Sequence, residues 1–357
     1  MKTEIKTKSA LFFIYLAVAF LIFMIGLNAG LTERIYANGL YPIISVIQRF
    51  ITSFLPFAIG DLLYLSLIFY IIRWLFIRFT KKDFTKDDFT ILSIQTGNFL
   101  LLLYITFKLC WGLNYSRPSI STKLGIDHET YQREQLIQLS NFLLKKLKVL
   151  SPLVNDSAVQ TNYTLMELED KAIFTFQKLA KDNSVFNYRF ASVKPVLNSW
   201  LVSKMGIEGY YNPLSGEANI NDRLPAFVLP FITCHEIAHQ LGIAREDEAN
   251  LIGYIAAINS PDVHFQYAAY YSMFKSVLFE IRLKYPDNYN LILENIPSSV
   301  ITNFKTERAF WMQYNGNMSR YMNKTFDKIL KLNNQKKGID SYQDIVLWLY
   351  NYHKHEL

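Results

Sequence analysis

Cysteine is scarce in this sequence of 357 residues, which contains only two. Cys110 lies inside a hydrophobic segment, and Cys234 directly precedes a histidine. A structural disulfide between these two positions is not expected. Cysteine usage therefore identifies no redox compartment.

The sequence also lacks internal repeats, low-complexity linkers and any long basic tract interleaved with aromatic residues. The formal net charge is +7, but the lysines and arginines are scattered through hydrophobic helices, which argues against nucleic acid as a partner. Anionic lipid accounts better for the positive charge. With 51% apolar residues, a chain of this length can bury a sizeable core, and two structural units are expected.

Three apolar segments are long enough to cross a bilayer, which takes about 20 residues. They cover residues 10–31, 57–79 and 89–113 and define a membrane domain over residues 1–113. A cleaved signal peptide is the alternative for the first segment. Its apolar run exceeds the roughly 7–15 residues of a signal sequence, and further spans follow, so a membrane span is favoured.

Basic residues cluster in the N-terminal leader and between Arg73 and Lys86, whereas the connection between the first two spans carries little charge. By the positive-inside rule, both basic segments are expected in the cytoplasm. Residues 114–357 then form an extracytoplasmic domain. The predicted location is a bacterial inner membrane, with this domain in the periplasm.

Helical periodicity dominates the predicted extracytoplasmic domain. Leucines recur every three or four residues from Leu136 to Leu150, and a second helix is predicted from Leu165 to Ala180. Between Tyr188 and Ile220, β-branched and aromatic residues alternate with glycine and proline, which indicates short antiparallel strands. The expected fold class is mainly α with a small antiparallel β-sheet.

The segment His235-Glu236-Ile237-Ala238-His239 carries the clearest chemical signal. On a helix, the two histidines fall one turn apart on the same face and can bind one zinc ion, while Glu236 can act as a general base. The bare pattern arises by chance in about one chain in a hundred of this length. Pro230 and Gly242 bracket a short helix over residues 231–241, which strengthens the zinc interpretation.

A zinc site of this type needs a third protein ligand. Glu248 is predicted as this ligand because it shares a helical face with apolar residues, and Glu246 is the alternative. Asp247 is expected to cap a helix or to accept a hydrogen bond from a ligand histidine.

Residues 234–242, followed by Glu246-Asp247-Glu248-Ala249-Asn250, resemble gluzincin metallopeptidases, in which a glutamate followed by alanine completes the zinc site. The resemblance implies an α+β zincin-like domain and transfers the third-ligand role to Glu248. The gap after His239 is shorter than in thermolysin-like enzymes. Arg245 stands where a metzincin would have its third histidine.

The whole chain also resembles a family of uncharacterised bacterial multi-pass membrane proteins with a domain of unknown function. Three segments, at residues 111–118, 206–213 and 216–221, carry this resemblance together with the three spans. It implies the architecture and supplies no substrate.

Zincins place an edge strand beside the motif helix, and residues 209–221 are the candidate here. Tyr210 and Tyr211 are expected to bind substrate, with Glu217 and Asn219 lining the cleft. An ordinary glycine-rich hairpin is the alternative. The donor that stabilises the oxyanion is left open among five downstream residues: His264, Tyr270, Tyr271, Arg308 and Tyr314.

The sequence therefore predicts a membrane-anchored zinc metalloprotease that cleaves peptide or protein substrates with zinc-activated water and Glu236 as general base. A metal-binding sensor or scaffold of the same fold is the alternative, although retention of Glu236 favours an enzyme. A transporter is disfavoured because the three spans contain few charges. No nucleic acid partner is expected, and the oligomeric state cannot be read from the sequence.

Overall fold

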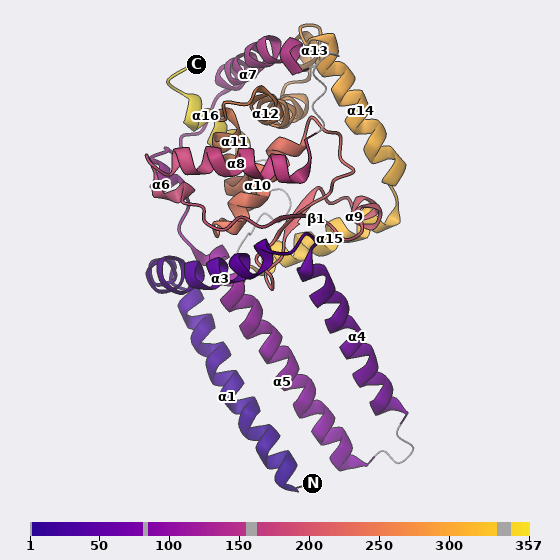
Figure 1. Cartoon of the computed structure of the whole chain (residues 1–357). Coiled ribbons are helices and arrows are strands. Elements are labelled where there is room, and N and C mark those ends of the chain that lie inside the picture. Colours follow the sequence, from indigo (N-terminus) through magenta and orange to yellow (C-terminus); the bar gives the residue numbers. More distant parts are fainter. Residues whose placement is uncertain (1, 81–84, 155–162, 334–343) are drawn as a thin grey trace.

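The computed structural model describes the chain except residues 1, 81–84, 155–162 and 334–343. Three long helices extend side by side from a helical domain, with the N-terminus at their far end (Figure 1). Lys81 and Lys82 of the predicted basic connection lie outside the described residues.

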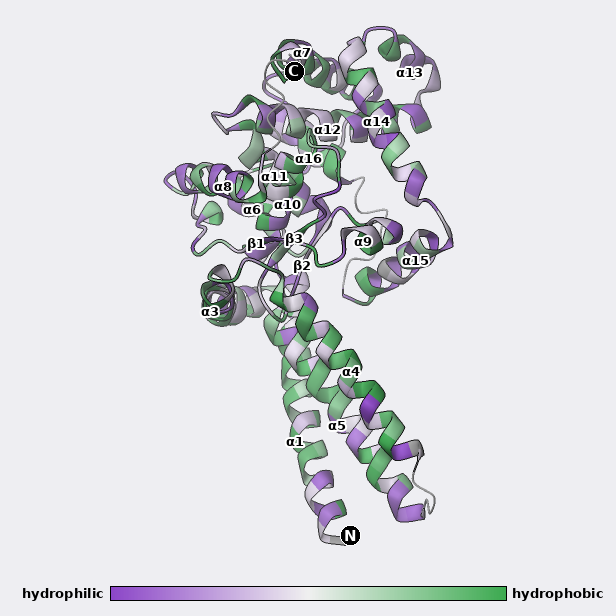
Figure 2. Ribbon diagram, turned by 45° about the vertical axis from the view of Figure 1, so that its right-hand side comes forward, coloured by the Kyte–Doolittle hydropathy of each residue, from purple (hydrophilic) through white to green (hydrophobic). Residues whose placement is uncertain are grey.

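The three long helices are α1 (Lys2–Gly26), α4 (Ile59–Phe79) and α5 (Lys86–Cys110). Each is long and apolar enough to cross a membrane, and most of their side chains are not buried against the protein. In Figure 2, where residues are coloured by hydropathy, the three helices are predominantly hydrophobic along most of their length. The three predicted spans are confirmed as candidate membrane helices. The first ends at Gly26 rather than at residue 31, because Asn28 caps a new helix.

The connection from α1 to α4 is also helical, which the sequence analysis did not predict. It consists of α2 (Ala29–Leu31), the π-helical segment η1 (Thr32–Leu40) and α3 (Tyr41–Ser53). The polar side chains of Ser45, Arg49 and Thr52 are buried. The exposed side of this segment is apolar: Ile43, Ile47, Phe50, Ile51 and Phe54. In Figure 1, α3 lies at the base of the domain, near the ends of the long helices. A helix with an apolar exposed side suits a position along a membrane surface.

The core of the domain beyond α5 is built from helices. The main ones are α7 (Arg133–Val154), α8 (Leu165–Leu179), α10 (Leu229–Gln240), α11 (Glu246–Ile258), α12 (Val263–Lys284) and α16 (Ile345–His353). Leu136, Leu139, Leu143 and Leu147 of α7 are completely buried, which confirms the predicted leucine helix. The second predicted helix is confirmed as α8.

Shorter helices and a peripheral layer complete the domain. They are η2 (Gly112–Ser116), α6 (Ser121–Leu124), η4 (Ser184–Phe186), α9 (Ser199–Met205), α13 (Pro286–Leu293), α14 (Ser298–Tyr314) and α15 (Asn317–Leu332). Of these, α9 and α15 lie close to the end of α4 (Figure 1).

The sheet has three strands in the order β1-β3-β2. β1 (Val193–Pro195) pairs in parallel with β3 (Ala218–Ile220), whereas β2 (Gly209–Tyr211) pairs with β3 in antiparallel orientation. The expected antiparallel sheet is therefore wrong in part, and the sheet is mixed. The chain between β1 and β3 contains α9 and β2, and a connection of this length allows the parallel pairing.

The hairpin formed by β2 and β3 holds the first turn of α4. Glu217 accepts hydrogen bonds from the backbone N–H groups of Ile59 (3.0 Å) and Gly60 (2.7 Å). A carboxylate at a helix N-terminus satisfies free N–H groups and interacts favourably with the helix dipole. Tyr210 donates a hydrogen bond to Asp61 of the same turn. These contacts fasten the sheet to a candidate membrane helix.

Replacing Gly60 by alanine tests this junction. The added Cβ would lie 2.2 Å from Nδ2 of the buried Asn212, so this side chain, or the hairpin that carries it, would have to shift away from α4. We expect Gly60→Ala to lower stability by about 1–3 kcal/mol, as overpacking does. Thermal unfolding in detergent measures the effect. Gly39→Ala is the control, because the nearest atom there is 3.8 Å away; equal unfolding temperatures for both variants would contradict the tight junction.

Candidate metal centre

The helix α10 presents two histidines in the core of the domain. Pro230 occupies its first turn, and Gly242 follows its end with a φ of +82°, a conformation that favours glycine. His235 and His239 lie one turn apart, and their Nε2 atoms are 3.1 Å from each other. Both imidazoles therefore turn the same nitrogen toward one point.

The next helix, α11, lies very close to α10. A Cβ on Gly253 would be 2.9 Å from the backbone nitrogen of His235 and 3.0 Å from its Cα. Only glycine permits this approach of two helices without displacement. As a result, the N-terminal residue of α11, Glu246, reaches the two histidines.

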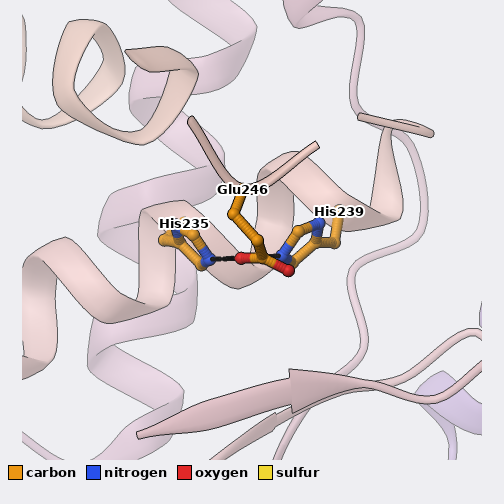
Figure 3. A group of neighbouring side chains, drawn as sticks. All are labelled: His235, His239 and Glu246. Atoms are coloured by element: carbon orange, nitrogen blue, oxygen red, sulfur yellow. Dashed lines mark hydrogen bonds and ion pairs between the residues drawn. The ribbon is translucent and has the colours of Figure 1, made fainter. Parts of the chain in front are cut away.

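Glu246, His235 and His239 form a triangle of possible metal ligands (Figure 3). The Oε2 atom of Glu246 is 3.4 Å from Nε2 of His235 and 3.5 Å from Nε2 of His239. Nitrogen and oxygen ligands lie about 2.0–2.2 Å from zinc, so two ligands at a tetrahedral angle lie about 3.3–3.5 Å apart. The residues present fit three corners of a tetrahedral metal site, with the fourth left for another ligand.

Glu248, the predicted third ligand, does not join this triangle. Its Oε1 atom accepts hydrogen bonds from the backbone N–H of Ile120 and from Arg245, both at 3.1 Å. This geometry favours Glu246, the alternative, over Glu248, because Glu246 lies beside the histidines. The bonds of Glu248 instead fix the segment that precedes α6 against the start of α11.

Asp247 does not contact either histidine through a hydrogen bond among the described residues. Its Oδ2 atom accepts a hydrogen bond of 2.8 Å from the indole of Trp348. Burial, followed by the charge of Glu248, raises the pKa of Asp247 to about 6. The structure thus places the Asp247 carboxylate against Trp348, whereas the sequence led us to expect a helix cap or a contact with a ligand histidine. That contact is made by the carbonyl oxygen of Ile243, which lies 2.7 Å from Nδ1 of His239 and fixes the orientation of its ring.

The turn between α10 and α11 is held by residues of the segment after α5. Arg117 donates a hydrogen bond of 2.8 Å to the carbonyl of Gly242, and Arg245 donates one of 2.9 Å to the carbonyl of Arg117. This reciprocal pair fixes the chain between His239 and Glu246. The sequence motif at residues 111–118 thus has a structural role beside the triangle.

Glu236 lies against the edge strand β2. A Cβ on Gly209 would be 2.6 Å from Oε1 of Glu236, and the Oε2 atom is buried without a hydrogen-bond partner among the described residues. Burial raises the pKa of Glu236 to about 8. A buried carboxyl oxygen without a partner is unfavourable, and a water or cation beside it would supply one.

Glu246 and the histidines shift each other's protonation. Burial alone would raise the pKa of Glu246, but His239 and His235 lower it below its ordinary value. Burial alone would lower the pKa of His239, but the neighbouring Glu246 raises it to about 9. Burial lowers the pKa of His235. Glu246 thus favours the charged form of His239, and a divalent cation bound by the three residues would compete with that proton.

Aromatic side chains from the membrane-proximal segments enclose the histidines. The ring of Trp111 lies 5.8 Å from that of His239 and 4.4 Å from that of Tyr211. Tyr41 of α3 donates toward the carbonyl of His239 at 3.4 Å. Burial and then the charge of Glu246 raise the pKa of Tyr115. The contact of Tyr41 was not predicted from the sequence, where its only signal is its place on the polar side of α3.

The residues predicted to bind substrate are dispersed. Tyr210 and Glu217 contact the first turn of α4, whereas the hydroxyl of Tyr211 lies 3.5 Å from that of Tyr41. Asn219 is completely buried, and its amide has no hydrogen-bond partner among the residues described. The contacts of Tyr210 and Glu217 join the β2–β3 hairpin to α4, which is a structural role. Two of the five oxyanion candidates bind away from the triangle, His264 to Asp262 and Tyr271 to Glu307.

Gly253→Ala tests whether helix proximity creates the triangle. The methyl group would meet the backbone of α10, which cannot give way as a flexible side chain can. We expect lower thermal stability, by about 1–3 kcal/mol, and weaker metal binding. Calorimetry and metal titration measure the two effects. Gly316→Ala is the control, since no heavy atom lies within 4 Å of its added Cβ; normal metal binding by Gly253→Ala would argue against the constraint.

Comparison with known proteins gives one match. The family described as "Protein of unknown function (DUF3810)" matches residues 36–350. No curated protein and no solved structure matches the chain. The matched residues include α3, α4, α5, the sheet and all three members of the triangle. The chain therefore belongs to the DUF3810 family.

Proposed function

We propose that this chain is a membrane-anchored zinc peptidase. The observation that carries the proposal is the triangle of His235, His239 and Glu246, whose donor atoms lie 3.1, 3.4 and 3.5 Å apart. Two histidines and a carboxylate are a ligand set of catalytic zinc sites, which leave one position open. Such a site is known in gluzincins, which the motif resembles.

Zinc bound there would supply a Lewis acid and make water an effective nucleophile at neutral pH. The residues of the chain then have separate roles. His235, His239 and Glu246 would hold the ion, and the carbonyl of Ile243 orients His239. Glu236 takes a proton from the attacking water and delivers it to the leaving amine. A cation nearby would lower the pKa of Glu236 from about 8 and favour the carboxylate that this role needs.

The strand β2 provides a place for an extended substrate. It forms one edge of the sheet, and its Gly209 lies directly against Glu236. A peptide that adds to this edge by main-chain hydrogen bonds would pass beside the general base. The zincin-like character of the domain forms part of this proposal.

The placement of the domain outside the cytoplasm is also a proposal. It rests on three candidate spans and on the basic residues of the N-terminal leader and of the connection between α4 and α5. An odd number of crossings puts the domain on the side opposite to the N-terminus. For a bacterial inner membrane this side is the periplasm.

A metal-binding sensor is the second candidate function. The observation that favours it is burial: His235, His239 and Glu246 are 8%, 5% and 6% exposed. A peptidase must admit a peptide carbonyl to the metal, whereas a sensor needs to admit only the ion. The two functions share the ligand triangle and differ in the need for Glu236.

Metal content tests the ligand assignment. We expect about one zinc per chain in detergent-purified protein after dialysis, measured by inductively coupled plasma mass spectrometry. Glu246→Gln removes a charged ligand and is expected to lose most of this zinc. Glu248→Gln is the matched control two residues away and should keep it. Loss of zinc in the Glu248 variant with retention in the Glu246 variant would restore Glu248 as the ligand.

Glu236→Gln separates the two candidate functions. The substitution preserves the shape of the side chain and removes the general base, so zinc content should remain unchanged. Cleavage of a fluorogenic peptide library should fall by at least about 100-fold, the usual contribution of general base catalysis. A wild-type protein that binds zinc and cleaves no peptide, alone or in membranes, would favour the sensor.

A further inference from the structure

A cavity of about 390 Å³ lies beside α3, at the C-terminal end of α10. Its walls come from η1 and α3, the segment around Arg117 and Lys123, the loop after η4, and the end of α10. Four cationic side chains line it, namely Arg49, Arg117, Lys123 and Arg189, and no aspartate or glutamate does. The volume is within the range of small-molecule sites, about 300–1,000 Å³.

Arg49 is the most informative of these cations because it is buried, with an exposed fraction of 4%. It donates a hydrogen bond of 2.8 Å to the carbonyl of Gln240, and its guanidinium lies 5.1 Å from the ring centre of Tyr188. Its Nε atom has no hydrogen-bond partner, and no carboxylate pairs with it among the described residues. The end of α10 offers only about half a negative charge. Burial of the remaining charge is unfavourable unless an anion accompanies it.

The other three cations of the cavity add further positive charge that is only partly compensated. Arg117 and Lys123 share a single carboxylate, that of Glu33. Arg189 is exposed at the rim, and the described part of the chain gives it no ion pair. Four cations against one carboxylate leave an excess of three positive charges around the cavity. Guanidinium groups bind phosphate through paired, charge-assisted hydrogen bonds.

The position of the cavity limits the source of such a ligand. It adjoins α3, whose opposite side exposes Ile43, Ile47, Phe50 and Ile51 near the ends of the candidate membrane helices. The cavity therefore lies close to the level at which lipid phosphates meet water. A bare phosphate ion would fill only part of about 390 Å³, whereas a phosphate with an attached glycerol headgroup would occupy more of it.

We propose that this cavity is a binding site for a phosphate group, held by Arg49, Arg117, Lys123 and Arg189. Two sources share this chemistry, the headgroup of an anionic phospholipid and a free phosphate. The site does not depend on the proposed peptidase, since it contains none of the metal ligands. A bound phosphate would nevertheless lie next to α10, which carries the two histidines. Arg49 donates a hydrogen bond to the carbonyl of Gln240, the last residue of that helix.

The test uses the full chain in neutral detergent and two probes. Native mass spectrometry counts phosphatidylglycerol and phosphatidylcholine molecules retained by the protein. Thermal unfolding in sodium phosphate, compared with sodium chloride of equal ionic strength, reports binding of free phosphate as a rise in unfolding temperature. We expect preferential retention of phosphatidylglycerol, a phosphate-dependent rise, or both.

Arg189→Gln is the decisive variant because its exposed side chain contributes no described packing. We expect this substitution to lower the affinity for whichever probe binds by roughly tenfold. This factor corresponds to the lower end of the free energies found for hydrogen bonds to charged groups. Arg34→Gln is the matched control, an exposed arginine of η1 outside the cavity wall. If Arg189→Gln weakens binding of phosphatidylglycerol alone, the cavity is a lipid site. If it weakens binding of inorganic phosphate, the cavity is a free-phosphate site. No binding of either probe, or equal binding by both variants and the wild type, would overturn the proposal.

Discussion

The close packing of α11 against α10 is the constraint on which the candidate metal centre depends. Gly253 brings the backbone of α11 to within van der Waals distance of His235, and this places Glu246 at the two imidazoles. The three donor groups are buried together, and each helps to satisfy the others. Burial of two histidines and a carboxylate in a core is costly without such mutual contacts or a bound cation. The arrangement thus follows from helix packing rather than from any single residue.

A second constraint joins this centre to the candidate membrane helices. The carbonyl of Gln240, the last residue of α10, accepts hydrogen bonds from Arg49 and Ser45 of α3. A cation at the C-terminal end of a helix stabilises it through the helix dipole. Because α3 turns its polar side toward α10, its apolar side faces outward. The connection between the first two candidate spans therefore supports the metal-bearing helix and presents an apolar face at the base of the domain.

The sheet provides the other attachment. Glu217 occupies the N-terminus of α4, and Gly209 of the same hairpin touches Glu236. The hairpin therefore lies between a candidate membrane helix and the proposed general base. The contacts of Glu217 with α4 and of Gly209 with Glu236 are joined by the two short strands β2 and β3. The sheet therefore contacts both a candidate membrane helix and the proposed general base.

The sequence was sufficient for features that depend on local patterns. Long apolar runs located the candidate spans, leucine spacing located α7, and the two histidines marked α10. The sequence favoured Glu248 as the third ligand, whereas Glu246 lies beside the histidines. Both residues begin the same helix, and only the packing of that helix decides which carboxylate faces the histidines. The parallel pairing of β1 with β3 is a long-range contact that strand patterns do not encode. In the sequence, α3 has one polar and one apolar side, as an ordinary surface helix does. Only the position of its neighbours shows that the polar side is buried and the apolar side exposed.

The metal site itself can be examined most directly by X-ray absorption at the zinc edge on the purified, zinc-loaded chain. We predict nitrogen and oxygen ligands at about 2.0–2.2 Å with the multiple scattering of two imidazoles. This signature should be absent from a His235→Ala, His239→Ala double variant. Zinc coordinated by sulfur at about 2.3 Å, or by oxygen alone without imidazole scattering, would contradict the account.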